Sequence, residues 1–146
     1  MRILILDDES DTLALGLLRE VLQEALDAQV LVCHTVERAV EALHDAPHDL
    51  VVTDVFVPIG ARPGGSLGRR AARFEDHYAH LGGLVLLDEL DRLDPTPAVL
   101  VHTACTEAPL IEVLDALGHD RVRKPAPPDV LLSAALSALG LPSPSF

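Results

Sequence analysis

The sequence predicts a doubly wound α/β domain, in which helices cover both faces of a parallel β-sheet. Short apolar runs with little alternation are interleaved with stretches that carry apolar residues at helical spacing. Runs of this kind are typical of parallel strands that are buried on both faces. The expected strands are 3–6, 30–33, 50–53, 98–102 and a weaker fifth at 121–123.

A helical pattern follows each expected strand. The first begins after Ser10, which we expect to cap it, and the second ends before Pro47. The third ends before Pro95, the fourth ends at Gly118, and the last spans 130–139 and is closed by Gly140. Five β-α units in this order predict right-handed crossovers and a single parallel sheet. The core-facing positions of the first two helices are Leu15, Leu18, Leu22, Ala25, Val36, Ala39, Val40 and Leu43.

Composition limits the possible partners of the chain. Its 146 residues carry a formal net charge of −12, which disfavours binding to nucleic acid. We expect no membrane partner, because no apolar stretch approaches the ~20 residues that span a bilayer. Two cysteines make no disulfide framework and indicate a reducing, cytoplasmic location. We expect one domain over 1–140 and a short C-terminal tail at 141–146.

Polar residues follow four of the five expected strands. Asp7 and Asp8 follow the first, Asp54 the third, Thr103 the fourth and Lys124 the fifth. In open α/β sheets the functional site lies beyond the carboxyl ends of the strands, so these side chains are expected at one edge. Carboxylates held close together repel one another, so either the pKa of one of them rises or the group binds a cation. A cluster of oxygen ligands suits Mg²⁺. A carboxylate can also act as a nucleophile and form an acyl phosphate.

These residues resemble the receiver domain of bacterial two-component response regulators, in a stand-alone form similar to the chemotaxis regulators. The resemblance rests on LILDDES at 4–10, VVTDVFVP at 51–58, GLVLLDEL at 83–90, VLVHTA at 99–104 and RKP at 123–125. It implies a flavodoxin-like sheet of order 2-1-3-4-5. It also implies that Asp54 is the phosphorylation site and that Thr103 and Lys124 contact the phosphoryl group.

The resemblance carries further expectations. Mg²⁺ would be held by Asp7, Asp8, Asp54 and the backbone carbonyl of Phe56, and the Lys124–Pro125 peptide bond would be cis. A histidine kinase or phosphotransfer protein would donate the phosphoryl group, and self-dephosphorylation would be slow, so the domain is no enzyme in the usual sense. The signal would pass to a downstream protein through residues 106–139, from a monomer or weak homodimer.

Two features depart from the family pattern. Arg121 stands where the family commonly has an aromatic residue that moves with the threonine, which puts the usual readout in doubt. An insertion at about 59–82 precedes the third helix, carries several arginines, and has a possible helix at 66–81. It is expected to cover Asp54 as a lid, to dock an acidic partner, or to be a solvated helix face.

Other interpretations stay open at this stage. The chain is alternatively an unphosphorylated pseudo-receiver that acts as a protein-binding module. A phosphatase resembling the haloacid dehalogenases is disfavoured because such enzymes need Asp-x-Asp after the first strand. Cys105 is either a buried filler or a redox modulator of the site. His77 and His80 are expected to be solvated rather than to bind metal.

Overall fold

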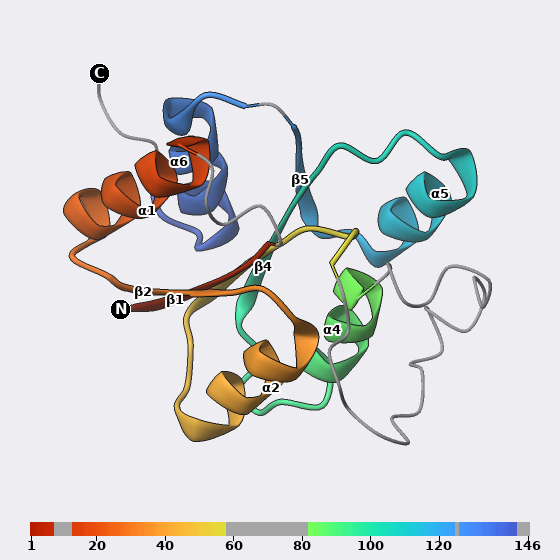
Figure 1. The fold of residues 1–146 in the computed structure, drawn as a ribbon, viewed down its shortest axis with the longest axis horizontal. Coiled ribbons are helices and arrows are strands. Elements are labelled where there is room, and N and C mark those ends of the chain that lie inside the picture. The colour runs from red at the N-terminus through yellow and green to blue at the C-terminus, as the bar shows by residue number, and fades with distance from the viewer. Residues whose placement is uncertain (8–12, 58–81, 125, 143–146) are drawn as a thin grey trace.

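The computed structural model describes residues 1–7, 13–57, 82–124 and 126–142. Within these ranges the chain forms one five-stranded parallel sheet of order β2-β1-β3-β4-β5, which confirms the predicted doubly wound fold (Figure 1). The strands are β1 (Arg2–Leu6), β2 (Gln29–Cys33), β3 (Leu50–Thr53), β4 (Ala98–Thr103) and β5 (Asp120–Arg123). The helices are α1 (Leu13–Leu26), α2 (Val36–Asp45), α4 (Gly82–Leu90), α5 (Ala108–Leu117) and α6 (Pro128–Ala138).

Two apolar clusters lie on opposite faces of the sheet. Ile3 and Ile5 of β1 face the cluster formed with α1 and α6, whereas Leu4 and Leu6 face the cluster formed with α2, α4 and α5. Successive side chains of a strand point to opposite faces, so a strand covered on both sides needs apolar residues at every position. This requirement explains the continuous runs in the sequence. It also explains why β5, an edge strand with mostly exposed residues, gave the weakest run.

Local sequence signals set the helix ends. The Thr35 hydroxyl oxygen accepts a hydrogen bond from the Arg38 N–H at 3.3 Å and caps α2. Gly118 and Gly140 adopt left-handed φ values of 72° and 73° after α5 and α6. Beyond α6, the Leu141 N–H bonds the Leu136 carbonyl at 2.8 Å, the pattern of a glycine-closed helix end. Both glycine stops are therefore confirmed.

The predicted core faces of the first two helices are nearly all confirmed. Val36, Ala39, Val40 and Leu43 are buried in α2, and Leu15, Leu18 and Leu22 are buried in α1. Ala25 was the wrong choice, because it is exposed and Leu26 packs against the core instead. Both positions follow Leu22 at helical spacing, and the larger leucine buries more apolar area.

Several expectations lie outside the described residues. These are the Ser10 cap, Asp8, nearly all of the insertion, the histidine pair at His77 and His80, and the Lys124–Pro125 bond. The third helix begins at Gly82 and ends at Leu90, before Pro95 as predicted. No helix in the described part of the chain is long and apolar enough to cross a bilayer.

Candidate functional site

The parallel ladder places three predicted site residues one step beyond the strands. The Asp7 N–H donates to the Cys33 carbonyl, and the Asp54 N–H donates to the Leu6 carbonyl, each at 3.0 Å. At β5 the Lys124 N–H donates to the Thr103 carbonyl at 3.0 Å. The sheet hydrogen bonding therefore continues through these residues and fixes their backbones at the carboxyl edge. The topology thus brings together side chains that lie up to 117 positions apart in the sequence.

Lys124 bridges the two carboxylates. Its Nζ donates to Asp7 Oδ2 at 2.7 Å and to Asp54 Oδ2 at 2.8 Å. All three side chains are largely shielded from water, with exposed fractions of 13% for Lys124, 5% for Asp7 and 7% for Asp54. Removing charges from water is costly unless they are paired and hydrogen-bonded, and here two carboxylates share one ammonium. This trio therefore carries one more negative than positive charge.

The surroundings of Lys124 favour its charged form. Burial lowers the pKa of the ammonium, but the hydrogen bonds and charges of Asp54 and Asp7 together raise it by more. The net pKa lies above its ordinary value of 10.5. Lys124 is therefore a permanent cation at neutral pH, able to neutralise whichever anionic oxygens lie beside it.

Backbone amides hold the other oxygen of Asp54. Its Oδ1 accepts hydrogen bonds from the Val55 N–H at 2.6 Å and the Phe56 N–H at 3.3 Å. The Thr53 hydroxyl donates to the Asp54 carbonyl at 2.9 Å. Both oxygens of the carboxylate and its own carbonyl are thus engaged, which fixes the direction in which Asp54 faces. A nucleophile held in one orientation avoids much of the entropic cost of reaching the attacking geometry.

Two glycines bring the start of α4 against the Asp54 loop. The Gly82 N–H donates to the Val57 carbonyl at 2.8 Å, and the Gly83 N–H donates to the Val55 carbonyl at 3.1 Å. A Cβ on Gly83 would overlap the carbonyl oxygen of Asp54, and one on Gly82 would overlap that of Val57. The first turn of α4 can approach this loop so closely only because both positions lack a side chain. The same contacts bring residues 57 and 82 together.

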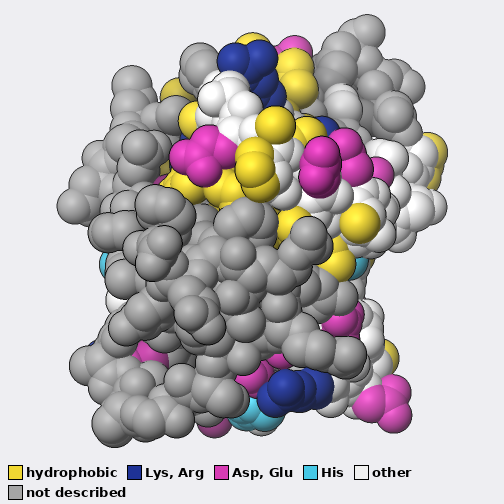
Figure 2. All heavy atoms as spheres, turned by 90° about the vertical axis from the view of Figure 1, so that its right-hand side faces the viewer, with side chains coloured by type: hydrophobic (Ala, Val, Ile, Leu, Met, Phe, Trp, Pro, Cys, Tyr) yellow, Lys and Arg dark blue, Asp and Glu magenta, His cyan; other side chains and the backbone are white. Residues whose placement is uncertain are grey.

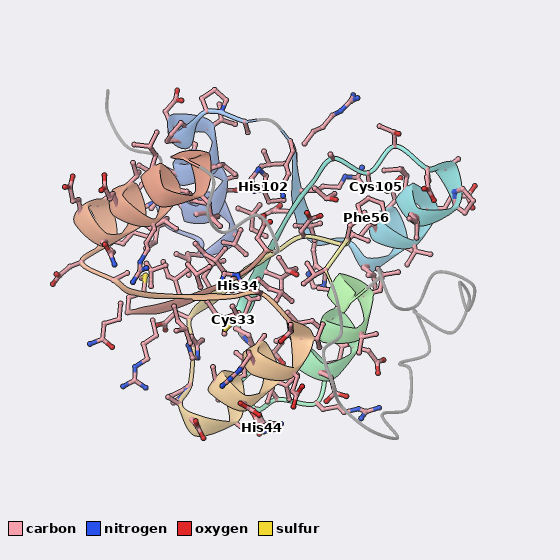
Figure 3. The ribbon with its side chains drawn as sticks, in the orientation of Figure 1. Cys33, His34, His44, Phe56, His102 and Cys105 are labelled. Carbon is pink, nitrogen blue, oxygen red and sulfur yellow. The ribbon has the colours of Figure 1, made fainter. Side chains whose placement is uncertain are left out.

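His34 supports the backbone of Asp7. Its Nδ1 lies 3.1 Å from the Asp7 carbonyl oxygen, a hydrogen bond in which the ring nitrogen is the donor. The Asp7 N–H is bonded to the Cys33 carbonyl, so both backbone groups of Asp7 are held by Cys33, the last residue of β2, and by His34, which follows it. Figure 3 shows His34 and Cys33 where β2 leads into α2.

Thr103 and Cys105 form the part of the site that leads toward α5. Thr103 is buried, and its hydroxyl oxygen accepts a hydrogen bond from the Cys105 N–H at 3.3 Å. Cys105 is 6% exposed, and burial is the largest cause that raises the pKa of its thiol. Figure 3 shows Cys105 and Phe56 on the α5 side of the sheet, where both belong to the same apolar cluster. Cys105 therefore fits the filler role better than that of a reactive thiol.

Arg121 points to the surface helix rather than into the core. Its Nη2 lies 3.0 Å from Asp115 Oδ1 of α5, and the side chain is 31% exposed. A charged side chain is rarely buried in an apolar interior, which agrees with this contact. The ion pair ties edge strand β5 to α5.

The predicted Mg²⁺ site lies partly within the described residues, which include Asp7, Asp54 and Phe56. In the described ranges, no group of three or more His, Cys, Asp or Glu side chains could hold a metal. Asp7 and Asp54 do converge on a single cation, the Lys124 ammonium, and carboxylate oxygens are the ligands that Mg²⁺ prefers. The chemistry of this donor pair therefore fits a divalent cation. The roles of Asp8 and of the Phe56 carbonyl stay predictions.

Comparisons with known proteins bear on this arrangement. No protein-family model matches the chain, and no curated protein matches it. Among solved structures, the non-phosphorylated HemR receiver domain from Leptospira biflexa is 22% identical with a TM-score of 0.63, over 99% of this chain and 98% of that one. A putative response regulator from Chloroflexus aurantiacus is 20% identical with a TM-score of 0.68, over 95% and 97%. The Vibrio cholerae chemotaxis protein CheY4 is 17% identical with a TM-score of 0.65, over 94% and 97%.

These similarities define the class of fold. The chain has the flavodoxin-like fold of the receiver domains of two-component response regulators. Each of these matches spans nearly the whole of both chains. One of the matched proteins is a chemotaxis regulator, the kind of receiver that the sequence motifs suggested.

Sequence reasoning missed three supporting contacts of the site. These are the His34 bond to Asp7, the Val55 and Phe56 amides at Asp54, and the close approach of Gly83. The adjacent Gly82 and Gly83 were a usable signal, because paired glycines at a helix start often mark a close backbone approach. Nothing in the sequence marked His34, since its partner is the backbone carbonyl of Asp7, 27 positions earlier in the chain.

Proposed function

We propose that the chain is a response-regulator receiver that accepts a phosphoryl group on Asp54. The observation that carries this proposal is the buried trio of Asp7, Asp54 and Lys124. Two carboxylates and one lysine, converging at the carboxyl edge of a receiver-type sheet, supply a nucleophile, a cation site and a phosphoryl-binding charge. The proposed donor is a histidine kinase or a phosphotransfer protein.

In the proposed reaction a carboxylate oxygen of Asp54 attacks the phosphorus atom of the donor. A P–O bond forms to Asp54, the bond between phosphorus and the donor breaks, and the donor leaves with that electron pair. The amides of Val55 and Phe56 hold one carboxylate oxygen in place, which keeps the nucleophile oriented. Phosphoryl transfer depends mainly on such positioning and on charge neutralisation.

Lys124 and Thr103 are the proposed phosphoryl-binding groups. Lys124 already lies 2.8 Å from Asp54, so its ammonium can pair with a phosphoryl oxygen after a small movement of the side chain. The Thr103 hydroxyl can donate its hydrogen to another phosphoryl oxygen, because its present bond to Cys105 uses only the oxygen as acceptor. Mg²⁺, when bound at Asp7, Asp8, Asp54 and the Phe56 carbonyl, would neutralise negative charge on the transferred group.

The signal is proposed to leave through the surface of α5, β5 and α6, at residues 106–139. Figure 2 shows the α5 side of the molecule, where apolar side chains lie among acidic and basic ones. The exposed residues of α5 are Ala108, Pro109, Glu112, Asp115 and Ala116. Such a mixed surface suits a transient protein contact. A cytoplasmic location is also proposed, because Cys33 and Cys105 are both free thiols.

The test is phosphorylation by a small donor. The native chain is incubated with acetyl phosphate and Mg²⁺, and its intact mass is compared with that of Asp54→Ala under the same conditions. The proposal expects one added phosphoryl group on the native chain, none on the variant, and none when Mg²⁺ is chelated. If a control receiver gains mass while this chain does not, phosphoacceptor function is contradicted.

A second candidate function is an unphosphorylated pseudo-receiver that acts as a binding module. The Arg121–Asp115 ion pair favours it, because the position that commonly carries a mobile aromatic is tied to α5. Measurement of Mg²⁺ affinity separates the two functions. A pseudo-receiver predicts weak or absent Mg²⁺ binding together with absent phosphorylation.

A further inference from the structure

The two edges of the sheet differ sharply in charge. An edge strand presents unpaired backbone groups, and natural proteins protect such edges with charged side chains, prolines or bulges. At β5, Asp120, Arg121 and Arg123 are exposed and charged. At β2, the sequence QVLVC of Gln29–Cys33 has no charged residue and no proline. In Figure 1, β2 runs between α1 and α2, away from β5.

Leu31 makes the β2 edge apolar at its centre. It is the middle residue of the strand and is 45% exposed, among the most exposed large apolar side chains of the described residues. It lies in a groove of about 610 Å³ between β2 and α2, and in an adjoining hollow of about 370 Å³. Both hollows are lined by Leu31, Ala42 and Asp45, so they form one trough along the strand.

The backbone of β2 is arranged for a symmetric partner. The Gln29 N–H bonds the Met1 carbonyl and the Cys33 carbonyl accepts from Asp7, so both residues face β1. Hydrogen-bonding directions alternate along a strand, so the backbones of Val30 and Val32 face the open edge. If a second copy paired antiparallel about Leu31, Val30 of each copy would pair with Val32 of the other. Leu31 would then lie beside Leu31 of the second copy.

Charges at the two ends of the trough fit this antiparallel arrangement. Glu37 and Glu41 line the end near Cys33 together with Arg38 and His34. Arg2 and His48 line the end near Gln29, and Asp45 lines both hollows. A twofold axis at Leu31 would bring Glu37 and Glu41 of one copy beside Arg2 and His48 of the other. Complementary ends of this kind fix register and favour a closed dimer over an open array.

We propose that the β2 edge is a homodimer interface, in which two copies pair antiparallel through β2 with Leu31 at the twofold axis. The pairing would join two sheets into one and would cover Leu31 between the two α2 helices. It requires no phosphorylation, and it is separate from the surface of residues 106–139 proposed to carry the signal. The net charge of −12 on each copy opposes association. Added salt screens this repulsion and should strengthen the dimer, until the attraction between the oppositely charged ends of the trough is screened as well.

The test is the molecular mass of the full chain measured by sedimentation, at chain concentrations from about 10 µM to about 1 mM. This range reveals a dimer with a Kd of about 100 µM. Leu31→Lys should raise the Kd at least about tenfold, because it places two ammonium groups side by side at the axis. Val130→Lys is the matched control, since Val130 is 44% exposed on α6, and it should leave the Kd unchanged. Arg2→Glu should weaken the dimer, and Glu41→Arg in the same chain should restore it.

Amide hydrogen exchange locates the contact independently. The Val30 and Val32 amides should become protected as concentration rises, and should lose that protection in Leu31→Lys. Three results would overturn the proposal: a monomer throughout the concentration range, a dimer that persists in Leu31→Lys, or a dimer that leaves both amides unprotected. Because Leu31 is exposed, far-UV circular dichroism of the variant should match that of the native chain.

Discussion

Replacing Lys124 with methionine should destabilise the fold by removing the ammonium that both buried carboxylates contact. Methionine keeps the unbranched stem and its packing, so the change removes mainly the charge. Removing one partner of a buried ion pair typically costs about 3–5 kcal/mol. With exposed fractions of 13%, 5% and 7% in the trio, little solvent screening reduces this cost. We expect the free energy of unfolding to fall by about 3 kcal/mol and the Tm by about 10 °C.

The assay is urea unfolding followed by far-UV circular dichroism, because the chain has no Trp and one Tyr. Arg38→Met is the control, since Arg38 is 78% exposed and lies 3.9 Å from Glu41, and its loss should change stability by at most about 0.5 kcal/mol. Mg²⁺ should recover part of the stability of Lys124→Met by supplying a replacement cation. If Lys124→Met were no less stable than Arg38→Met, the trio would not be the coupled site described above.

Three further predictions follow from the same geometry. Gly83→Ala should lower the free energy of unfolding by about 1–3 kcal/mol and slow phosphorylation of Asp54, because the new methyl overlaps the Asp54 carbonyl. An unchanged phosphorylation rate would mean that the close approach of α4 does not affect the site. Replacing residues 58–81 with a short turn should leave a cooperative urea transition, because the Gly82 N–H and Val57 carbonyl already meet at 2.8 Å. Each halving of loop length should add about 0.6 kcal/mol to the free energy of unfolding, and an unfolded product would refute this. Folding raises the pKa of Lys124 above its ordinary value of 10.5. The stability that the Lys124 ammonium contributes is therefore complete below pH 10.5 and is lost as the pH rises above that value. Above pH 10.5 the urea midpoint should fall more steeply for the native chain than for Lys124→Met.

The sequence predicts the site where residue type and strand position are enough. Asp7, Asp54 and Lys124 follow strands whose apolar runs are easy to recognise, and parallel strands bring their carboxyl ends to one edge. The side-chain contacts among them then follow from the ladder, which extends one residue beyond each strand. The fold class and this part of the site were therefore predictable from the residues, whereas the strand order came from the resemblance to receiver domains.

Contacts that depend on how helices pack were not predictable from the sequence. The partner of Arg121 is Asp115 because α5 lies beside the edge strand, and no spacing rule relates those two positions. The exposed state of Leu31 depends on α2 leaving a trough beside β2. Ala25 and Leu26 were equally spaced candidates for the core, and only packing decides between them.

Phosphoacceptor function is tested most directly by locating the phosphoryl group on the chain. After incubation with acetyl phosphate and Mg²⁺, borohydride reduction converts an aspartyl phosphate to homoserine, which peptide mass spectrometry identifies by position. We expect homoserine at position 54, absent when Mg²⁺ is chelated and absent in Asp54→Asn. Modification at another residue, or a Mg²⁺-independent product, would contradict the assignment of Asp54 as the phosphoacceptor.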